Sequence, residues 1–234
     1  RKESSAASDV YKRQGSKGIK NKNIFKVGNK PLIEHTFHAA TNSNIKLNFV
    51  LTDSLKIKKI AKKFNIIEDY IRPKNLSQSK TSLTDTLYDF HLWLDKKNIY
   101  YDYMVILQPT SPLRNYKDIN NSINIIKKNK SMSLFSISKS LEHPYESIIK
   151  KKDKWRFVLN KSKKFYRRQD FDIETYFING AIYISNRKLI KRKKTFKNTK
   201  HTFYSMPKNR SLEINDKEEA HIIDSILKQE KKWK

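Results

Sequence analysis

The sequence predicts an α/β fold built on a mostly parallel sheet. Two observations carry this prediction: short apolar runs of strand length alternate with segments of helical periodicity, and most helical segments reach about ten residues or more. Such alternation is typical of βαβ units. With 234 residues and 37% hydrophobic content, the chain can bury one substantial core but is short for two. We therefore expect a single domain over residues 15–234.

Five segments show the apolar spacing of an amphipathic helix. Pro31 is expected to open the first, because proline is tolerated at the first helical position. Asp216 and Glu219 have the spacing of a capping box and are expected to start the last. The apolar positions, helix by helix, are Ile33, Phe37 and Ala40; Ile57, Ile60, Ala61 and Phe64; Leu83, Leu87, Phe90 and Leu94; Ile119, Ile123 and Ile126; and Ala220, Ile223 and Leu227.

Short apolar runs between these helices are expected to form strands. The run at 103–107 is continuous, which is typical of a strand buried on both faces. Ligands bind at the carboxyl ends of strands in open α/β sheets, so we look for chemistry in the loops that follow them. The expected strands are KLNFVL (46–51), YMVIL (103–107), SLFSIS (133–138), WRFVLN (155–160), AIYIS (181–185) and TFYSM (202–206).

Composition excludes several classes of protein. The chain has no cysteine, so it forms no disulfide or thiolate metal site, and its six histidines lack metal-ligand spacing. No apolar run of 18 residues is present, so we expect no membrane span and a cytoplasmic location. The formal charge of +28 suggests nucleic-acid binding, but the lysines are scattered beside many Asn and Ile residues. We expect no nucleic-acid partner, and keep a basic nucleic-acid-binding protein as the alternative.

Residues 1–14, RKESSAASDVYKRQ, are polar and aperiodic. Their DVYKRQ stretch can be back-translated into a common sequencing-adaptor sequence. We therefore expect residues 1–14 to be a library artefact in place of the native N-terminus, and we exclude them from fold reasoning. On this hypothesis the first strand of the domain is missing or poorly imitated.

Two loops carry the candidate chemistry. In QGSKGIKNKN (14–23), two of the four glycines flank Ser16 and Lys17, an arrangement that can cradle a triphosphate with backbone N–H groups and ammonium charges. The standard phosphate-loop motif is absent, so an ordinary basic turn is the alternative. In LQPTSPLR (107–114), two prolines stiffen a strand exit. They hold Gln108, Thr110, Ser111 and Arg114 where these can meet a ligand.

Together these loops resemble the CMP-sialic acid synthetases, cytidylyltransferases that activate nine-carbon acidic sugars. The family's glycine-rich pattern R-[GQ]-[GN]-S-K-G followed by K-N is matched by Arg13, Gln14, Gly15, Ser16, Lys17, Gly18, Lys22 and Asn23. Further family segments follow in the same order over residues 13–230: GNKPLIEHT (28–36), LTDS (51–54), RPKNLS (72–77), LQPTSPLR (107–114), RRQ (167–169) and NGAIYI (179–184). The resemblance implies a Rossmann-like fold of the nucleotide-diphospho-sugar transferase type.

The resemblance also implies a reaction and a nucleotide site. The anomeric hydroxyl of the sugar attacks the α-phosphate of CTP and expels pyrophosphate. Lys22, Gln108 and Arg13 are the implied catalytic residues. CTP is then contacted by Gly15, Ser16, Lys17, Gly18, Asn23, Arg72 and Ser82.

Magnesium is the implied cofactor. The family holds it with S-x-D-x-D before the final helix, whereas this chain has SLEIND (211–216), so Glu213 and Asn215 replace the two aspartates. Asn supplies only a neutral oxygen, and we therefore add Asp53 as a third candidate ligand. Asp53 can instead cap the helix that follows it, and both roles stay open for this residue. Asp216 could also bind the metal, but we expect it to cap the last helix.

The acceptor side departs from the family. Gln108, Asn179, Arg167 and Arg168 are the implied sugar contacts, and the two arginines can equally form a solvated basic surface. Glu146 stands where a lysine is common and Phe177 where an arginine is common. Sialic, legionaminic and pseudaminic acids therefore all stay open as substrates, and a CMP-Kdo-type transferase is the alternative within this mechanism.

The family uses a projecting segment to complete a homodimer. The matching region here is about 140–178, and it mixes aromatic residues with charges as interfaces do. The aromatic residues are Trp155, Phe157, Phe165, Tyr166 and Phe171. We therefore expect a homodimer.

Overall fold

The computed structural model describes residues 19, 21–76, 82–159, 173–192 and 201–230. Its centre is a four-stranded sheet in the order β3-β7-β4-β8. β7 is antiparallel to both of its neighbours, and β4 and β8 are parallel, so three of these strands share one direction. The strands are β3 (Tyr103–Leu107), β4 (Ser133–Lys139), β7 (Tyr176–Asn186) and β8 (His201–Ser205).

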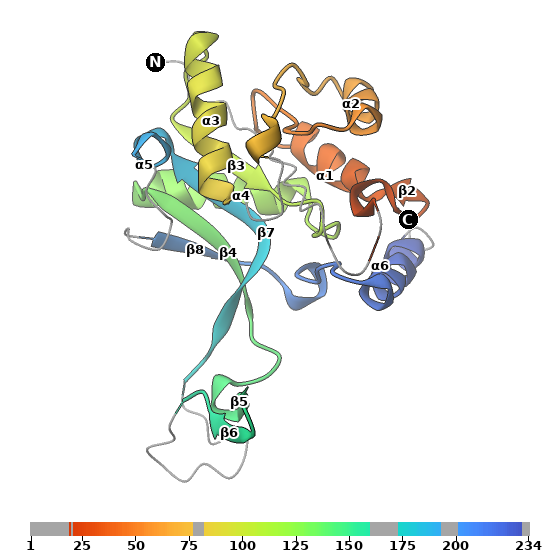
Figure 1. The fold of residues 1–234 in the computed structure, drawn as a ribbon, viewed down its shortest axis with the longest axis vertical. Helices are drawn as coiled ribbons and strands as arrows, with labels where there is room; N and C mark the ends of the chain where they lie inside the picture. The colour runs from red at the N-terminus through yellow and green to blue at the C-terminus, as the bar shows by residue number, and fades with distance from the viewer. Residues whose placement is uncertain (1–18, 20, 77–81, 160–172, 193–200, 231–234) are drawn as a thin grey trace.

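The helices surround this sheet (Figure 1). The α-helices are α1 (Leu32–Thr41), α2 (Leu55–Lys62), α3 (Leu83–Lys96), α4 (Tyr116–Asn129), α5 (Arg187–Lys191) and α6 (Lys217–Glu230). The 3-10 helices are η1 (Lys22–Ile24), η2 (Lys74–Leu76), η3 (Pro144–Glu146) and η6 (Lys208–Arg210). In the described ranges, none of these helices has the length and apolarity needed to cross a membrane.

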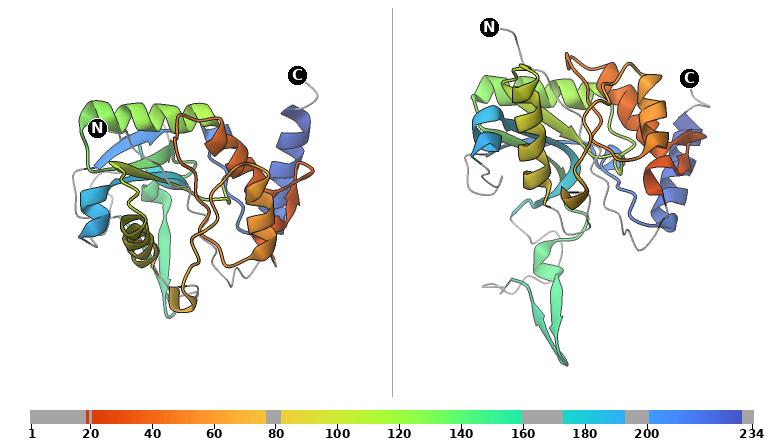
Figure 2. Two further views of the ribbon diagram at one scale, coloured as in Figure 1. Left: turned by 90° about the horizontal axis from the view of Figure 1, so that it is seen from above. Right: turned by 45° about the horizontal axis from the view of Figure 1, so that its top comes forward.

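The sheet lies between two helical layers (Figure 2). Side chains alternate along a strand, so Val105 and Leu107 pack on one face of the sheet with α1 and α4. Met104 and Ile106 pack on the other face with α3 and α5. Burial on both faces explains why this strand is continuously apolar, as the sequence indicated. The α/β class is therefore confirmed, but the described sheet is mixed rather than mostly parallel, because β7 runs antiparallel to both of its neighbours.

Several predicted elements begin or end differently in the structure. Among the described residues, the run 46–51 forms no regular strand; Phe49, Val50 and Leu51 are buried, but the pairing of this stretch is limited there to an isolated parallel bridge, Phe49 to Ile67. Pro31 lies one residue before α1 and pairs in the small hairpin of β1 (Lys26–Val27) and β2 (Lys30–Pro31). Helix α5 has five residues, too few for a periodic pattern, and was not expected from the sequence.

The last helix packs against the first hairpin. Asp216 Oδ1 accepts the Glu219 N–H at 2.9 Å, and Glu219 Oε2 accepts the Asp216 N–H at 3.2 Å, which confirms the predicted capping box. The Gly28 N–H donates to Asp224 Oδ1 at 2.7 Å. Gly28 has φ +60°, and a Cβ there would lie 2.9 Å from Leu227 Cβ, so this close approach requires glycine.

The outer halves of β4 and β7 leave the sheet as a two-stranded ribbon (Figure 1). At its far end lies a hairpin of β5 (Ile148–Lys151) and β6 (Lys154–Phe157). Of the predicted strand 155–160, residues 155–157 belong to β6. This projecting arm exposes a row of large apolar side chains, namely Ile148, Ile149, Trp155, Phe157, Val158, Leu159, Ile173, Tyr176, Phe177 and Ile178.

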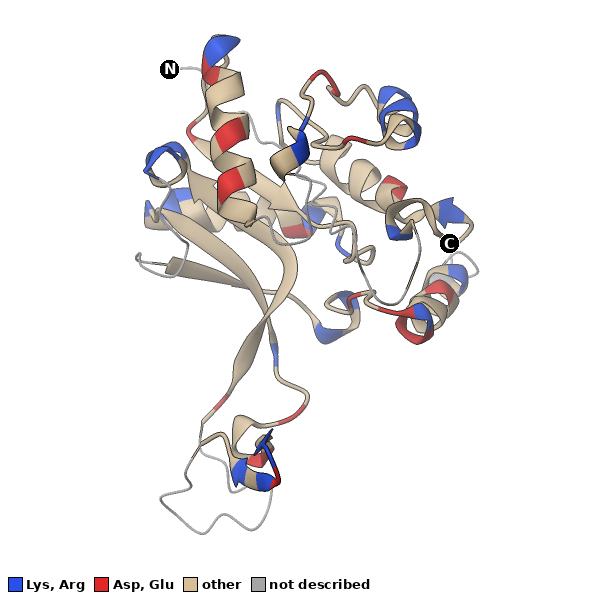
Figure 3. Ribbon diagram, viewed as in Figure 1, with Lys and Arg blue, Asp and Glu red and all other residues tan. Residues whose placement is uncertain are grey.

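Basic residues are spread over many elements of the described structure. Figure 3 shows Lys and Arg on α2, α5, α6, η6 and the β5–β6 hairpin, with no single element carrying them. A nucleic-acid surface gathers positive charge on one face or along one helix. The observed spread favours a compositional origin for the charge.

Candidate active site

Two polar side chains and a glycine meet where β3 ends. Gln108 follows β3 directly, and Gly180 lies within the neighbouring strand β7. Gly180 has φ +70°, and a Cβ there would lie 3.0 Å from Glu213 Oε1 and 3.5 Å from Gln108 Oε1. The absence of a side chain at Gly180 thus lets both polar groups approach the same stretch of backbone. We call this place the Gly180 corner, formed by Gln108, Gly180 and Glu213.

Glu213 is held at the corner by the loop that follows β3. Thr110 Oγ1 donates to Glu213 Oε1 at 2.8 Å, and the Ile214 N–H donates to the Thr110 carbonyl at 2.8 Å. The segment 211–216 therefore runs beside the loop 107–114. Sequence reasoning expected both to lie at the active end of the sheet, but it did not identify Thr110 as the residue that joins them.

Lys22 brings the first loop to the same segment. Its Nζ donates to the Ile214 carbonyl at 3.1 Å and to the Asn215 carbonyl at 3.2 Å. Beside it, Asn23 is only 8% exposed, and its Nδ2 has no hydrogen-bond partner in the part of the chain that the structure describes. Buried polar groups normally have partners, so an unpaired buried donor indicates a position where a ligand acceptor can bind.

Arg114 does not face a ligand, contrary to the expectation from its motif. Its side chain is buried and donates to the carbonyls of Gln108 at 3.0 Å and Ala181 at 2.8 Å, and to Thr36 Oγ1 at 2.7 Å. Burial lowers its pKa to about 10, and the charge of nearby Asp118 opposes that shift. Arg114 therefore fixes the Gln108 backbone against β7.

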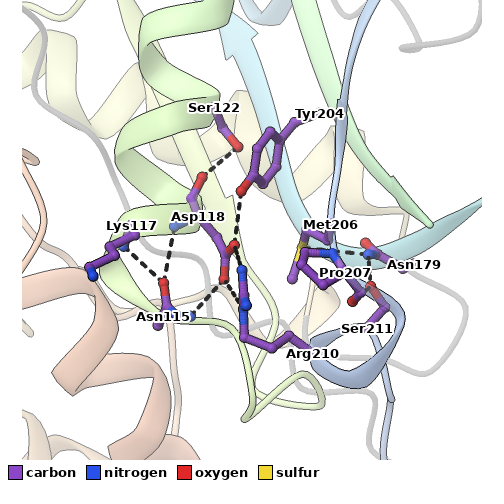
Figure 4. Close-up of polar contacts among 10 residues, drawn as sticks. All are labelled: Asn115, Lys117, Asp118, Ser122, Asn179, Tyr204, Met206, Pro207, Arg210 and Ser211. Atoms are coloured by element: carbon purple, nitrogen blue, oxygen red, sulfur yellow. Dashed lines mark hydrogen bonds and ion pairs between the residues drawn. The ribbon is translucent and has the colours of Figure 1, made fainter.

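Asn179, an implied sugar contact, uses its side chain inside the protein. Its Oδ1 accepts from Ser136 Oγ at 2.6 Å and from the Ala181 N–H at 3.2 Å. Its Nδ2 donates to Ser211 Oγ at 3.0 Å (Figure 4). The residue is 2% exposed. It thus connects the Gly180 corner to the start of segment 211–216, and its contact with a sugar stays a prediction.

The remaining nucleotide candidates lie on neighbouring elements. Arg72 is buried and donates to the Leu51 carbonyl at 2.9 Å. Ser82 caps α3, with its Oγ accepting the Asp85 N–H at 3.1 Å. The other residues implied for the two substrates, Arg13, Gly15, Ser16, Lys17, Gly18, Arg167 and Arg168, lie outside the described residues.

The three implied metal ligands differ in position. Glu213 is half-buried at the Gly180 corner, whereas the side chains of Asn215 and Asp53 are exposed. Asp53 does not cap α2, since the N-cap residue is Ser54. Within the described ranges, no three His, Asp or Glu side chains gather closely enough to hold a metal ion.

The donor chemistry of the corner nevertheless fits magnesium. A carboxylate, Glu213, and an amide oxygen, that of Gln108, approach the same glycine. Magnesium prefers oxygen ligands and is commonly bound by one or two carboxylates together with substrate phosphates. The corner therefore suits a cation that is shared with a nucleoside triphosphate.

Similarity to other proteins supports the family that these motifs suggest. A family model described as Cytidylyltransferase matches residues 10–231. The N-acylneuraminate cytidylyltransferase of Streptococcus agalactiae serotype V is 31% identical over 219 residues, which are 92% of this chain and 52% of that protein. The chain thus spans about half the length of this relative.

Two further relatives match over most of both chains. The CMP-N,N'-diacetyllegionaminic acid synthase of Legionella pneumophila is 28% identical, with 92% of this chain and 89% of that protein covered. A pseudaminic acid cytidylyltransferase of Campylobacter jejuni is 25% identical, with 92% and 93% covered.

Solved structures share the fold. A CMP:2-keto-3-deoxy-manno-octonic acid synthetase complexed with CTP gives a TM-score of 0.67 at 13% identity, covering 97% of this chain and 100% of that one. A 4-diphosphocytidyl-2C-methyl-D-erythritol synthase gives 0.68 at 10% identity, with the same coverage. Because the family model covers nearly the whole chain, this protein belongs to the cytidylyltransferase family.

Proposed function

We propose that this protein transfers CMP from CTP to the anomeric hydroxyl of a nonulosonic acid. The hydroxyl oxygen forms a bond to the α-phosphorus, the bond from that phosphorus to the β-phosphate oxygen breaks, and pyrophosphate leaves. The hydroxyl proton passes to solvent. The single observation that carries the proposal is the Gly180 corner, where Gln108 and Glu213 meet beside the segment tethered by Lys22. Family membership supplies the nucleotide and the reaction class.

The residues around the corner contact different parts of the two substrates in this proposal. Phosphoryl transfer depends on placing the reactants and stabilising charge rather than on covalent help from the protein. The Lys22 ammonium lies beside segment 211–216, where it stabilises negative charge on the phosphates. The unpaired Nδ2 of Asn23 donates to the nucleotide, and the Gln108 amide contacts the sugar.

Glu213 holds magnesium in this proposal. When bound, the ion supplies charge neutralisation to the phosphate oxygens. Glu213 provides the carboxylate, the Gln108 amide oxygen lies at the same glycine, and Asn215 and Asp53 are candidates for weaker or water-mediated contacts. Since the described site offers one well-placed carboxylate, the phosphates of CTP supply most of the oxygen ligands of the magnesium ion.

The acceptor is a nonulosonic acid of the sialic, legionaminic or pseudaminic type. Relatives named for each of the three match this chain at 25–31% identity. The likeness to the Kdo enzyme is at the level of the fold. Phe177 stands where the sialate pattern has an arginine and is exposed on the outer half of β7, so we keep all three acids as candidate acceptors.

The projecting arm supports a homodimer. Its exposed apolar side chains include Trp155 at 62% and Phe157 at 53% exposure, which is unfavourable unless a partner covers them. Light scattering coupled to gel filtration should give twice the chain mass of 27.9 kDa. Phe157→Asp should give a monomer, and Leu92→Asp on α3, which is also exposed, should not. A monomeric wild-type protein would remove the dimer from the proposal.

The test of function is pyrophosphate release. CTP and magnesium would be offered with N-acetylneuraminate, legionaminate, pseudaminate and Kdo in separate reactions. We expect release with one nonulosonic acid, and loss of release in Glu213→Gln but not in Glu218→Gln, an exposed residue in the first turn of α6. Absence of release with every acid, together with no effect of CTP on the melting temperature, would refute the proposal. CTP is a cytoplasmic nucleotide, so we place the reaction in the cytoplasm.

A further inference from the structure

A buried carboxylate, that of Asp118, lies in the first turn of α4 (Figure 4). Asp118 is fully buried and accepts four hydrogen bonds. Two come from Arg210, with Nη2 to Oδ1 at 2.7 Å and Nε to Oδ2 at 3.1 Å. The others come from Tyr204 Oη at 2.9 Å and from the Asn115 N–H at 3.1 Å. An ionised carboxylate offers about four acceptor positions, so this one is fully satisfied.

Arg210 and Asp118 form a bidentate ion pair. A guanidinium that donates two bonds to one carboxylate fixes both the distance and the orientation of the pair. The hydrogen bond to Asp118 is also the main reason why the pKa of Arg210 is raised, even though burial opposes that change. We call this pair the Asp118–Arg210 clamp.

The clamp joins the two chain segments that build the active site. Asp118 is in the first turn of α4, directly after the loop 107–114, and it completes the capping box with Asn115. Arg210 ends η6, directly before segment 211–216. Neither side chain belongs to the corner itself. Their contact nevertheless fixes the point from which the chain runs to Glu213.

Segment 211–216 is thus attached to the loop 107–114 and α4 on both sides of Glu213, in addition to the bond from Thr110 Oγ1 to the Glu213 carboxylate itself. The clamp holds its start, and the pairing of Ile214 with Thr110 holds it beyond Glu213. Glu213 lies between these attachments. We propose that Asp118 and Arg210 are positioning residues that set the Glu213 carboxylate at the Gly180 corner, and through it the magnesium affinity of the reaction. The second part of this proposal rests on the proposed function.

Hydrogen exchange tests the positioning without reference to activity. Arg210→Met removes both charge-assisted bonds, so local opening of segment 211–216 should become about 10- to 100-fold more frequent. The Ile214 amide should therefore exchange faster by that factor in native buffer. Arg187→Met is the matched control, because Arg187 bonds to Asp95 at 2.6 Å with 27% side-chain exposure, against 29% for Arg210. The Arg187→Met variant should leave the exchange rate of the Ile214 amide unchanged.

A magnesium titration tests the consequence. In Arg210→Met, the magnesium concentration that gives half-maximal pyrophosphate release should rise about tenfold or more, while Arg187→Met should match the wild type. Arg210→Lys keeps the charge but cannot donate two bonds in the same geometry, so it should give an intermediate value. Melting temperatures identify any variant that is simply unfolded, and Arg210→Lys then takes the place of Arg210→Met.

The outcomes separate the two ideas. Unchanged Ile214 exchange in Arg210→Met and Arg210→Lys would overturn the clamp, whatever the activity. Faster exchange with an unchanged magnesium requirement would overturn its link to the metal. A wild-type protein without activity toward any of the acids would count against the proposed function, and the exchange experiment would still decide whether the clamp positions Glu213.

Discussion

Replacing Gly180 by alanine tests the geometry of the corner most directly. The residue has φ +70°, and an added Cβ would lie 3.0 Å from Glu213 Oε1, 3.4 Å from Glu213 Cδ and 3.5 Å from Gln108 Oε1. A contact of 3.0 Å forces the carboxylate to move by a few tenths of an ångström. Gly180→Ala should therefore displace the proposed metal ligand while leaving every polar side chain in the protein.

The cost to stability follows from two terms. A non-glycine residue in the left-handed region costs roughly 1–2 kcal/mol. Moving Glu213 strains its 2.8 Å bond from Thr110, which is worth up to about 1 kcal/mol. The sum is roughly 1–3 kcal/mol. For a chain of this length, that corresponds to a fall of about 2–12 °C in melting temperature.

Gly28→Ala provides the matched control. Gly28 has φ +60°, and its added Cβ would meet Leu227 Cβ at 2.9 Å, so the strain is at least as large. The site, however, lies between the first hairpin and α6, away from the corner. Both variants should be destabilised, whereas only Gly180→Ala should lose on the order of 100-fold in kcat/KM, as expected for a misplaced catalytic group.

The assay is pyrophosphate release measured well below both melting temperatures and corrected for the folded fraction by circular dichroism. If Gly180→Ala and Gly28→Ala had equal activity per folded molecule, the corner would not be the reacting centre.

Three further predictions concern single residues. Lys22→Met should reduce pyrophosphate release by about 100-fold or more, because it removes a charge beside the phosphates, whereas Lys26→Met, an exposed neighbour, should not. Asp216→Ala should lower the unfolding free energy in urea by about 1 kcal/mol with little loss of activity, since Asp216 caps α6; a large loss of activity would make it a metal ligand instead. Burial lowers the pKa of His35 and His91, so below the unfolded value of 6.5 the unfolded chain binds more protons. The unfolding free energy should therefore fall as the pH is lowered from 7 to 5.5, and less so in His35→Gln; an equal fall in both proteins would contradict this origin.

Local patterns in the sequence predicted five of the six described α-helices and missed α5, which is too short to show a periodic pattern. The Asp216–Glu219 capping box forms as expected, because both partners lie within one turn and need no other part of the chain. The run 46–51 was identified as buried, but its pairing was not correctly predicted. Apolar side chains indicate burial, whereas a ladder of hydrogen bonds depends on a neighbouring strand that the local sequence does not specify.

The polar residues of the site were predicted as a group rather than by role. The motifs indicated Gln108, Glu213 and Lys22, which the structure brings to one region. They also indicated Arg114 and Asn179, whose side chains are bonded inside the protein. A polar residue in a motif can contact a ligand or support the residues that do. Only its partners in the folded chain distinguish these roles.

The way segment 211–216 is held explains how the chain tolerates asparagine at position 215 in the segment that we propose holds magnesium. Lys22 and Thr110 form hydrogen bonds with main-chain groups of Ile214 and Asn215. A different side chain at position 215 therefore leaves these hydrogen bonds unchanged. In the proposed site, Glu213 provides the carboxylate at the corner, and Asn215 stands where the family has a second aspartate. A site with one carboxylate binds free magnesium weakly and depends on the phosphates for the remaining oxygens. We therefore expect magnesium to raise the melting temperature only when CTP is present.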